Sequence, residues 1–364
     1  MINKLGFGFL RLPKKEREID WDAVTAMVDV FLAGGRTFFD TCYTYLNGLS
    51  EAAIKRCVSS RIPRDRFMLC DKLPGYLFKS HADCQKYFEE ELERCGVEWF
   101  DVLMLHWLND VNYEKAEKYE EFRFLREKKA EGSAKRIGFS FHGSAELLDR
   151  ILREHPEVDV VLLQLNYADW NSVGIQSRRC YETCVRHGKA VFAMEPVKGG
   201  TLSSLPEEAE AMLRKVHPDW TPSDWALRFV QSLPAVEICL SGMAEVSQVE
   251  DNIRPFEPLN EEEIKLLMEV RKIIEKATAV PCTSCRYCES HCPKKIPIPQ
   301  YLGMLNELHR FPREGWKIAP TYHQLAQTSG KASDCISCHS CEKHCPQRID
   351  IAARMKEVTA AFEE

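Results

Sequence analysis

Residues 100–107 read FDVLMLHW, a nearly continuous apolar run that closes on a histidine. Parallel strands buried on both faces have this composition, because neither of their faces meets solvent. Seven further β-rich runs of this kind precede residue 244. They are Leu5–Leu10, Thr37–Thr41, Arg66–Leu73, Arg136–His142, Val158–Tyr167, Ala190–Val197 and Val236–Met243. The sequence therefore predicts eight buried strands.

Amphipathic helical stretches separate the predicted strands. They are Trp21–Ala33, Ser50–Ser60, His81–Arg94, Tyr113–Ala130, Ala145–Glu154, Ser172–His187 and Ser223–Ser232. Strict alternation of strand and helix, at roughly 30 residues per unit, is typical of a (β/α)8 TIM barrel. A doubly wound sheet also alternates. The count of eight strands and the lack of a G-x-G-x-x-G motif after the first one favour the barrel.

Polar or ionisable residues close almost every predicted strand. They are Asp40, Lys72, His106, Ser140, Gln164 and Glu195, followed by the loop at Gly242. In a TIM barrel the carboxyl ends of all strands meet at one face, and active sites are built there. Residues about 30 positions apart in sequence would therefore converge on one site.

Six strings at these strand ends, in this order, resemble the aldo-keto reductases. They are LGFGFLRL (5–12), FFDTCYTYLNGLSE (38–51), LCDKL (69–73), LMLHW (103–107), IGFSFHG (137–143) and SGMAEVSQVEDN (241–252). The resemblance extends over about residues 5–254 and implies an NAD(P)H-dependent oxidoreductase acting on a small-molecule carbonyl or alcohol. It also carries the family's catalytic Asp, Tyr, Lys and His onto four positions, which are Asp40, Tyr45, Lys72 and His106.

The chemistry of carbonyl reduction suits these four residue types. Hydride goes to carbon, and the oxygen needs a proton as it gains alkoxide character. A free tyrosine has a pKa near 10, so a neighbouring Lys72 ammonium is expected to lower the pKa of Tyr45 and strengthen it as the acid. His106 could hydrogen-bond the substrate oxygen, and Asp40 could hold Lys72. Tyr43 has the same chemistry, and only the D-x4-Y-x-N-G pattern of the resemblance selects Tyr45.

The resemblance also supplies candidate cofactor contacts. Ser140 and Gln164 match residues that hold the nicotinamide carboxamide, and Asp251 and Asn252 match residues near the adenine. The implied cofactor is NAD(H) or NADP(H).

At several cofactor positions the chain departs from the family pattern. The usual Asn after Ser140 is Phe141, and the aromatic that commonly stacks on nicotinamide is Met194. The basic pair that often binds the 2′-phosphate is replaced by Gly242 and Gln248, with Glu245 between them. Because an acidic side chain repels a phosphate dianion, NADH is predicted to bind better than NADPH.

Two cysteine runs form an internal repeat. CTSCRYCESHCPKKIPI (282–298) and CISCHSCEKHCPQRIDI (335–351) both have the pattern C-x2-C-x2-C-x3-C-P. This is the ligand run of bacterial ferredoxins, in which the fourth cysteine serves the other cluster. Two 4Fe–4S clusters are therefore predicted. One is bound by Cys282, Cys285, Cys288 and Cys345, and the other by Cys292, Cys335, Cys338 and Cys341.

Zinc is the main alternative, since paired C-x2-C motifs also form zinc sites with four cysteine ligands. A third cysteine at the next step, a fourth before proline and duplication of the whole run favour iron–sulfur clusters. The eight cysteines outside the runs are expected to be small buried hydrophobes. They are Cys42, Cys57, Cys70, Cys84, Cys95, Cys180, Cys184 and Cys239.

The spacer between the runs, 42 residues from Cys292 to Cys335, contains a helical pattern at Pro299–His309. Residues of about 280–360 therefore resemble a helical ferredoxin. We predict an aldo-keto reductase-like barrel over 1–258, a linking helix in 259–280 and a small, mainly helical ferredoxin-like domain over 281–364.

The overall composition limits the partners. The net charge is −6 and the sequence pI is about 6.1, so there is no basic excess to neutralise nucleic-acid phosphates. There is no apolar run of about 18 residues to span a membrane, and the first residues lack the pattern of a signal peptide. A cytoplasmic protein is expected.

Two functions remain open. The first is an oxidoreductase whose clusters relay single electrons to or from the barrel's reaction. The second is a barrel with little nicotinamide-dependent activity, whose clusters serve a structural, redox-sensing or electron-delivery role toward a partner protein.

Overall fold

The computed structural model describes residues 4–16, 18–172, 175–277, 280–310 and 315–363. The chain forms two compact units. The first comprises Met1–Asn166, Gln176–Pro196 and Leu227–Leu259. The second comprises Tyr167–Ile175, Val197–Ala226 and Asn260–Glu364. Two of its three segments are therefore insertions in the sequence of the first unit. Residues 278 and 279 of the predicted linking segment lie outside the described residues.

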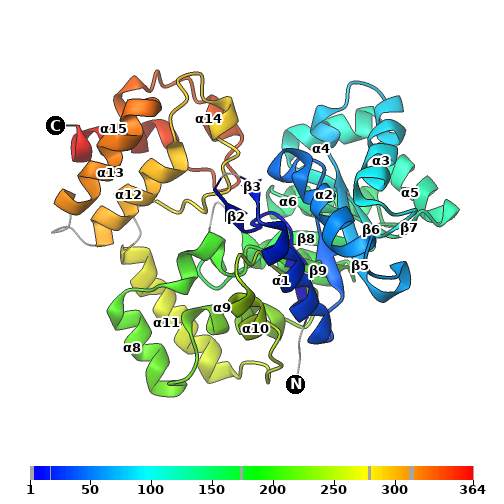
Figure 1. The fold of residues 1–364 in the computed structure, drawn as a ribbon, viewed down its shortest axis with the longest axis horizontal. Coiled ribbons are helices and arrows are strands. Elements are labelled where there is room, and N and C mark those ends of the chain that lie inside the picture. Colours follow the sequence, from blue (N-terminus) through cyan, green and yellow to red (C-terminus); the bar gives the residue numbers. More distant parts are fainter. Residues whose placement is uncertain (1–3, 17, 173–174, 278–279, 311–314, 364) are drawn as a thin grey trace. The chain divides into compact units, whose positions relative to one another are not determined.

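The first unit is a closed barrel of eight parallel strands, as predicted (Figure 1). Around the barrel the order is β1-β10-β9-β8-β7-β6-β5-β4, and β1 closes it by pairing with both β10 and β4. The strands are β1 Leu5–Gly8, β4 Phe38–Asp40, β5 Met68–Leu73, β6 Phe100–Leu108, β7 Ala134–Phe141, β8 Val160–Gln164, β9 Ala190–Met194 and β10 Val236–Ser241.

The helices of this unit follow the predicted alternation. They are α1 Trp21–Ala33, α2 Leu49–Ile54, α3 Ala82–Cys95, α4 Asp110–Lys118, α5 Glu121–Glu131, α6 Ala145–Glu154, α7 Ser177–Arg186 and α10 Val246–Asn252. The helix predicted over 113–130 is two helices, because Glu120 has a φ of 53° and turns the chain between them. A short hairpin between β1 and α1, formed by β2 Lys14–Lys15 and β3 Glu18–Ile19, was not predicted.

The barrel interior shows which face of each strand points inward. Val102 and Met104 of β6, Val160 and Leu162 of β8, and Cys70 of β5 belong to one buried cluster. Because side chains alternate along a strand, residues two apart share a face. Lys72 therefore lies on the inner face of β5 with Cys70, and the intervening Asp71 lies on its outer face.

The second unit is mainly helical, as predicted for the part that follows the barrel. Its helices are α8 Glu207–Val216, α11 Glu261–Ala277, α12 Ile298–Arg310, α13 Gly315–Thr328, α14 Ser340–Lys343 and α15 Ile351–Phe362. Helix α9, Pro222–Ser232, runs from this unit into the first. Helices α12 and α15 pack together around a core that includes Tyr301, Tyr322 and Val358. Neither α8 nor the last three helices were predicted.

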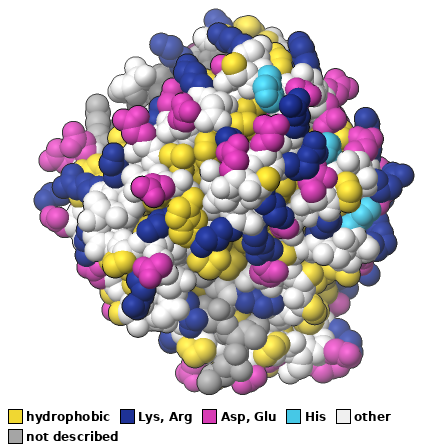
Figure 2. Space-filling view, turned by 90° about the vertical axis from the view of Figure 1, so that its right-hand side faces the viewer, with side chains coloured by type: hydrophobic (Ala, Val, Ile, Leu, Met, Phe, Trp, Pro, Cys, Tyr) yellow, Lys and Arg dark blue, Asp and Glu magenta, His cyan; other side chains and the backbone are white. Residues whose placement is uncertain are grey.

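Charged side chains of both signs are intermingled over the face shown in Figure 2, with apolar side chains scattered between them. Among the described residues, no helix has the length and apolar character needed to cross a bilayer.

Candidate active site and cysteine centres

Three of the four predicted catalytic residues lie on adjacent strands of the barrel. Asp40 ends β4, Lys72 lies near the end of β5 and His106 lies near the end of β6. The Lys72 ammonium donates hydrogen bonds to Asp40 Oδ1 at 2.5 Å and to the Thr41 carbonyl at 2.6 Å. Lys72 is fully buried and Asp40 is nearly so, so this ion pair is shielded from solvent.

Tyr45 joins this group from the turn that follows β4. It begins the short helix Tyr45–Gly48, where Leu46 and Asn47 have left-handed backbone angles. The Lys72 ammonium lies 5.0 Å from the centroid of the Tyr45 ring. The Tyr45 and His106 rings meet edge to face, with their centroids 5.7 Å apart. The structure thus brings the four residues together, although their catalytic roles stay predictions.

Burial controls the protonation of this group. Burial raises the pKa of Tyr45 well above its usual value, and the charge of Asp40 raises it further. Burial lowers the pKa of His106 well below its usual value, and the Lys72 charge adds to that effect. Tyr45 therefore keeps its proton and His106 is neutral. The net pKa of Tyr45 is raised in this structure, because burial dominates, and the Lys72 ammonium is bound to Asp40 and Thr41. The expected stabilisation of the phenolate by Lys72 stays a prediction.

A thiol that sequence reasoning treated as a small hydrophobe is part of the site. Cys42 Sγ lies 3.0 Å from His106 Nδ1, and both side chains are buried. A chain of contacts continues from Cys42 to the Thr44 hydroxyl at 3.5 Å and from Thr44 to the Tyr76 hydroxyl at 2.9 Å. The available signal was the position of Cys42 in the sequence, because it follows by two residues the Asp40 that ends β4.

The predicted carboxamide contacts lie at the ends of β7 and β8, and the predicted adenine contacts lie at the end of α10. The Ser140 hydroxyl accepts a hydrogen bond from the Trp107 backbone N–H at 2.7 Å. Gln164 ends β8 and is buried, and its backbone carbonyl accepts from the Ser177 hydroxyl at 2.8 Å. The Asn252 amide donates to the Ser241 hydroxyl at 3.3 Å. A cofactor role for these residues stays a prediction.

The departures from the family pattern lie at Phe141, which ends β7, on β9 and around the start of α10. Met194 ends β9 and is half-buried. The side-chain amide oxygen of Gln248, Oε1, accepts a hydrogen bond from the Ala244 backbone N–H at 2.9 Å, which closes the loop before α10. A Cβ added at Gly242 would lie 3.3 Å from the Arg11 side chain, so an arginine from the β1 loop lies near this position.

Four cysteines line one cavity of the second unit. They are Cys282, Cys285 and Cys288 from the first run and Cys345, the last cysteine of the second run. Leu302 and Ile349 supply apolar walls.

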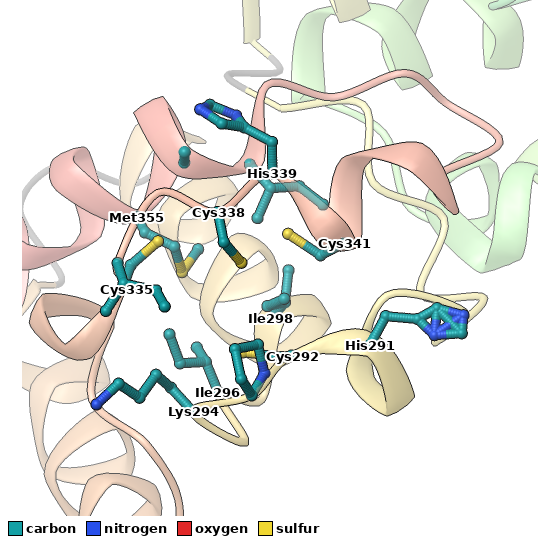
Figure 3. Close-up of a pocket in the computed structure, with 14 residues that line it drawn as sticks. His291, Cys292, Lys294, Ile296, Ile298, Cys335, Cys338, His339, Cys341 and Met355 are labelled. Atoms are coloured by element: carbon teal, nitrogen blue, oxygen red, sulfur yellow. The ribbon is translucent and has the colours of Figure 1, made fainter.

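The other four cysteines line a second cavity, shown in Figure 3. They are Cys335, Cys338 and Cys341 from the second run and Cys292, the last cysteine of the first run. Ile296, Ile298 and Met355 supply apolar walls. Each cavity thus contains four thiols and apolar surroundings, a donor set that fits a 4Fe–4S cluster. The crossed pairing of the runs is the arrangement that their spacing predicted, and ligation itself stays a prediction.

The internal repeat extends to the backbone. Ser284 and Arg286 of the first run have positive φ, and so do the equivalent Ser337 and His339 of the second. Left-handed residues at alternate positions turn successive peptide N–H groups toward one side, which favours an anionic group there. The Ser284 backbone N–H donates a hydrogen bond to Cys282 Sγ at 3.5 Å.

A (β/α)8 barrel with these residues at its strand ends precedes a module with two four-cysteine cavities. The model of the aldo/keto reductase family matches residues 4–272, and the model of the 4Fe–4S dicluster domain matches residues 281–349. The chain belongs to the aldo/keto reductase family and carries a 4Fe–4S dicluster domain after the barrel.

Relatives support this assignment at the level of the barrel. An aldo-keto reductase from Mycobacterium avium is 30% identical over 43% of this chain and 50% of its own length. The chain thus spans about half the length of the first curated relatives it matches. L-galactose dehydrogenase from Arabidopsis thaliana is 23% identical over 75% of this chain and 91% of its own length. A solved aldo/keto reductase from Klebsiella pneumoniae, in complex with NADP and acetate, has a TM-score of 0.61 and 20% identity, covering 74% of this chain and 91% of that one. At this identity the likeness establishes the fold alone.

Proposed function

We propose that the protein interconverts a carbonyl and an alcohol in the barrel, with Tyr45 as general acid and base and two 4Fe–4S clusters relaying electrons. The observation that carries the proposal is the buried group of Asp40, Tyr45, Lys72 and His106 at the strand ends. A nicotinamide, when bound, supplies or accepts a hydride. Ser140, Gln164 and Asn252 are the residues that would hold it.

Tyr45 performs the proton transfer in this proposal. Its hydroxyl keeps its proton in the buried site and releases it only as the substrate oxygen gains negative charge. The positive charge of Lys72, held near the ring by Asp40, stabilises the phenolate that forms. Because Tyr45 is neutral before the reaction and its phenolate is stabilised as it forms, the site stabilises the transition state more than the ground state.

His106 positions the substrate oxygen, and Cys42 sets the imidazole for that task. Burial raises the pKa of Cys42, so its sulfur carries a proton, and His106 is neutral. If the thiol donates to Nδ1, the ring proton must lie on Nε2, which can then donate to the carbonyl oxygen. The contacts through Thr44 and Tyr76 can supply the donors that keep the thiol in this orientation.

The eight cysteines would hold the two clusters, four thiolates to each. When bound, such clusters would supply single electrons, and two of them would match the two electrons of a carbonyl reduction. The two protons come from Tyr45 and from solvent. The alternative role, in which the clusters act as structure, sensor or port for a partner protein, requires the same ligands without coupling to the barrel.

One anaerobic experiment separates these roles. The clusters are reduced chemically without nicotinamide, a panel of carbonyl compounds is added, and cluster reoxidation is followed together with product formation. Matching rates, lost in the Tyr45→Phe protein, support the relay. Clusters that stay reduced across the panel, while NADH or NADPH still drives reduction, assign the chemistry to nicotinamide alone. No turnover with any donor overturns the proposed reaction.

A further inference from the structure

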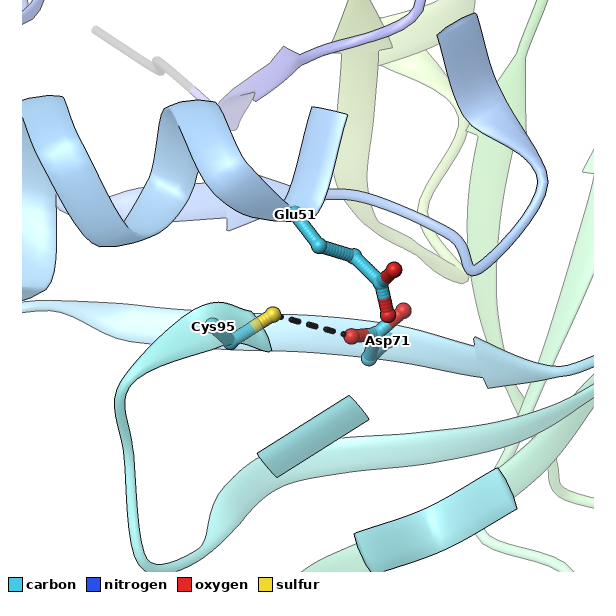
Figure 4. Close-up of side chains that lie close together, drawn as sticks. All are labelled: Glu51, Asp71 and Cys95. Atoms are coloured by element: carbon cyan, nitrogen blue, oxygen red, sulfur yellow. Dashed lines mark hydrogen bonds between the residues drawn. The ribbon is translucent and has the colours of Figure 1, made fainter. Parts of the chain in front are cut away.

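A second group of potential ligands lies on the outer face of β5, away from the barrel interior. Glu51 of α2, Asp71 of β5 and Cys95 at the end of α3 place one oxygen, one oxygen and one sulfur within 4.8 Å of one another. Figure 4 shows the three side chains pointing toward a common point. All three have zero exposed surface, which is rare for two acids and a thiol.

The hydrogen bonds of this group leave it incompletely satisfied. Asp71 accepts from the Lys72 N–H at 2.8 Å and from the Cys95 thiol at 3.2 Å. One oxygen of Glu51 accepts from Arg94 at 3.2 Å, and its other oxygen, Oε1, is buried without a partner. A buried carboxylate oxygen without a donor is costly, so a missing proton or cation is indicated.

Glu91 adds an independent observation. It is fully buried, and both of its carboxylate oxygens lack a hydrogen-bond partner. It lies four residues before Cys95 on α3, so the two side chains share one face of that helix. Burial raises its pKa first, and the nearby charges of Asp71 and Glu51 raise it further, although Glu91 is not one of the three residues whose ligand atoms lie within 4.8 Å of one another.

The charges of the surroundings indicate a divalent ion. Three buried carboxylates meet one guanidinium, that of Arg94. The nearby Lys72 ammonium is already occupied by Asp40 and Thr41. Ionised Glu51 and Asp71 together with a Cys95 thiolate would carry three negative charges against the one positive charge of Arg94, so a divalent cation would balance them while Glu91 keeps its proton.

We propose that Glu51, Asp71 and Cys95 bind one divalent cation of the zinc type, with the buried Glu91 beside them. A thiolate together with carboxylates is a donor set for borderline metals such as Zn²⁺, and Mg²⁺ or Ca²⁺ would prefer oxygen alone. On binding, Cys95 releases its proton to solvent and its sulfur becomes a ligand in place of a hydrogen-bond donor. The ion would join α2, β5 and α3, the elements that follow Tyr45 and carry Lys72, and its presence does not depend on the proposed reaction.

The test measures zinc directly. Protein with fully occupied clusters, verified by iron analysis, is equilibrated with ZnCl2, desalted and assayed by elemental analysis. The expected content is about one zinc per chain, falling at least tenfold in Glu51→Gln and in Cys95→Ser. Cys184→Ser serves as the matched control, because it removes a fully buried thiol from α7 and should keep the zinc. X-ray absorption at the zinc edge should show about one sulfur at 2.3 Å and oxygens near 2.0–2.2 Å.

Two results would overturn the proposal. The first is equal zinc content in the wild type, Glu51→Gln and Cys95→Ser, or an all-sulfur zinc spectrum that places the metal in a cluster cavity. The second is no retained zinc, with infrared absorption of a protonated carboxyl group that disappears in Glu51→Gln. Should the variants fail to fold, the wild type decides, because chelation must then remove the zinc and lower the thermal midpoint while the iron stays bound.

Discussion

The barrel site and the cysteine cavities differ in how their chemistry is specified. In the barrel, Asp40, Lys72 and His106 come from different strands, and burial sets which of the groups carry protons. In the cavities, three of four thiols come from one short run, and the backbone repeats with them. Acid–base chemistry therefore depends on distant neighbours, whereas cluster binding depends on local spacing.

The two cavities also differ from each other. In the first, Cys288 is buried and Cys282 and Cys285 are partly buried. In the second, Cys338 is exposed, and Ile336, between two of its cysteines, is 58% exposed. Because electron transfer weakens with distance, we expect the second cluster to exchange electrons with soluble donors more readily.

The largest effect is expected from Cys345→Ala, because it removes a ligand supplied by the opposite run. The cluster predicted for Cys282, Cys285 and Cys288 should be lost, and iron should fall from about eight atoms per chain to about four. Iron analysis and electron paramagnetic resonance measure this, with Cys184→Ala as a buried-thiol control. Loss of the cluster at Cys335, Cys338 and Cys341 instead would show that each run binds its own cluster.

Tyr45→Phe should reduce carbonyl turnover by about 10²–10⁴-fold, the usual contribution of a general acid. Iron content and folding should not change, since only a hydroxyl is removed. Tyr43→Phe is the matched control, because the Tyr43 hydroxyl donates to Glu90 at 2.7 Å and lies outside the predicted catalytic group. A Tyr45→Phe protein that keeps most of its activity would place the acid elsewhere.

The fold was largely predictable because its signals are local. The eight apolar runs correspond to the eight strands. A strand that is buried on both faces has a nearly continuous apolar sequence, so it can be predicted without knowing which strands it pairs with. The break at Glu120 was missed because the helical pattern continues across it and only the backbone angle changes. The cavity partners were predictable because a repeated spacing carries the crossed pairing with it.

The chemistry of the barrel was less predictable because it depends on contacts between distant residues. Cys42 and His106 are 64 positions apart, and no pattern joins them. The Tyr45 pKa was expected to fall because of the nearby Lys72. In the structure burial raises this pKa, and burial depends on many distant residues, so it cannot be seen in a short stretch of sequence. The period of β5 places Asp71 outward, but only the packing of α2 and α3 shows that Glu51 and Cys95 meet it.

A smaller effect is expected at Cys42. Cys42→Ala removes one hydrogen bond from His106 Nδ1, worth about 0.5–1.5 kcal/mol, so kcat/KM should fall by up to roughly tenfold. Cys42→Ser should restore most of this loss, because a hydroxyl can also donate to Nδ1. Nitrogen NMR of His106 should show its proton on Nε2 in the wild type and a mixture of tautomers in Cys42→Ala. A wild-type imidazole protonated on Nδ1 would contradict the assigned direction of the thiol hydrogen bond.

The pH dependence should be weak where an ordinary histidine would titrate. The His106 pKa is lowered by burial, so the folded protein keeps the imidazole neutral below pH 6.5. Carbonyl reduction should therefore show no loss of kcat/KM as the pH falls through 6.5. The free energy of unfolding, by contrast, should depend on pH in this range. His106 takes up a proton near its ordinary pKa when the protein is unfolded, and it does not do so when the protein is folded. The free energy of unfolding should thus decrease below about pH 6.5, and less so in His106→Asn.

The smallest effect concerns the choice between NADH and NADPH. Gly242 and Gln248 offer no cation for a 2′-phosphate, the Gln248 oxygen is used by the Ala244 N–H, and exposed Glu245 adds a negative charge. The interaction of two exposed charges is worth about 0.2–1 kcal/mol, so the repulsion by Glu245 should make NADH bind roughly two- to fivefold more tightly than NADPH at low salt. Protein fluorescence gives both dissociation constants in an oxygen-free chamber.

Two variants sharpen that comparison. Gln248→Arg should raise NADPH affinity and leave NADH affinity nearly unchanged, because it places a guanidinium where the family pattern has one. Tighter NADPH binding by the wild type would mean that a cation outside this segment binds the phosphate. Arg11 is then the residue to change, since its side chain lies beside Gly242 while its guanidinium lies 3.7 Å from Glu195. Loss of the NADPH preference in Arg11→Gln would assign the phosphate contact to the β1 loop and return the acidic α10 loop to a structural role.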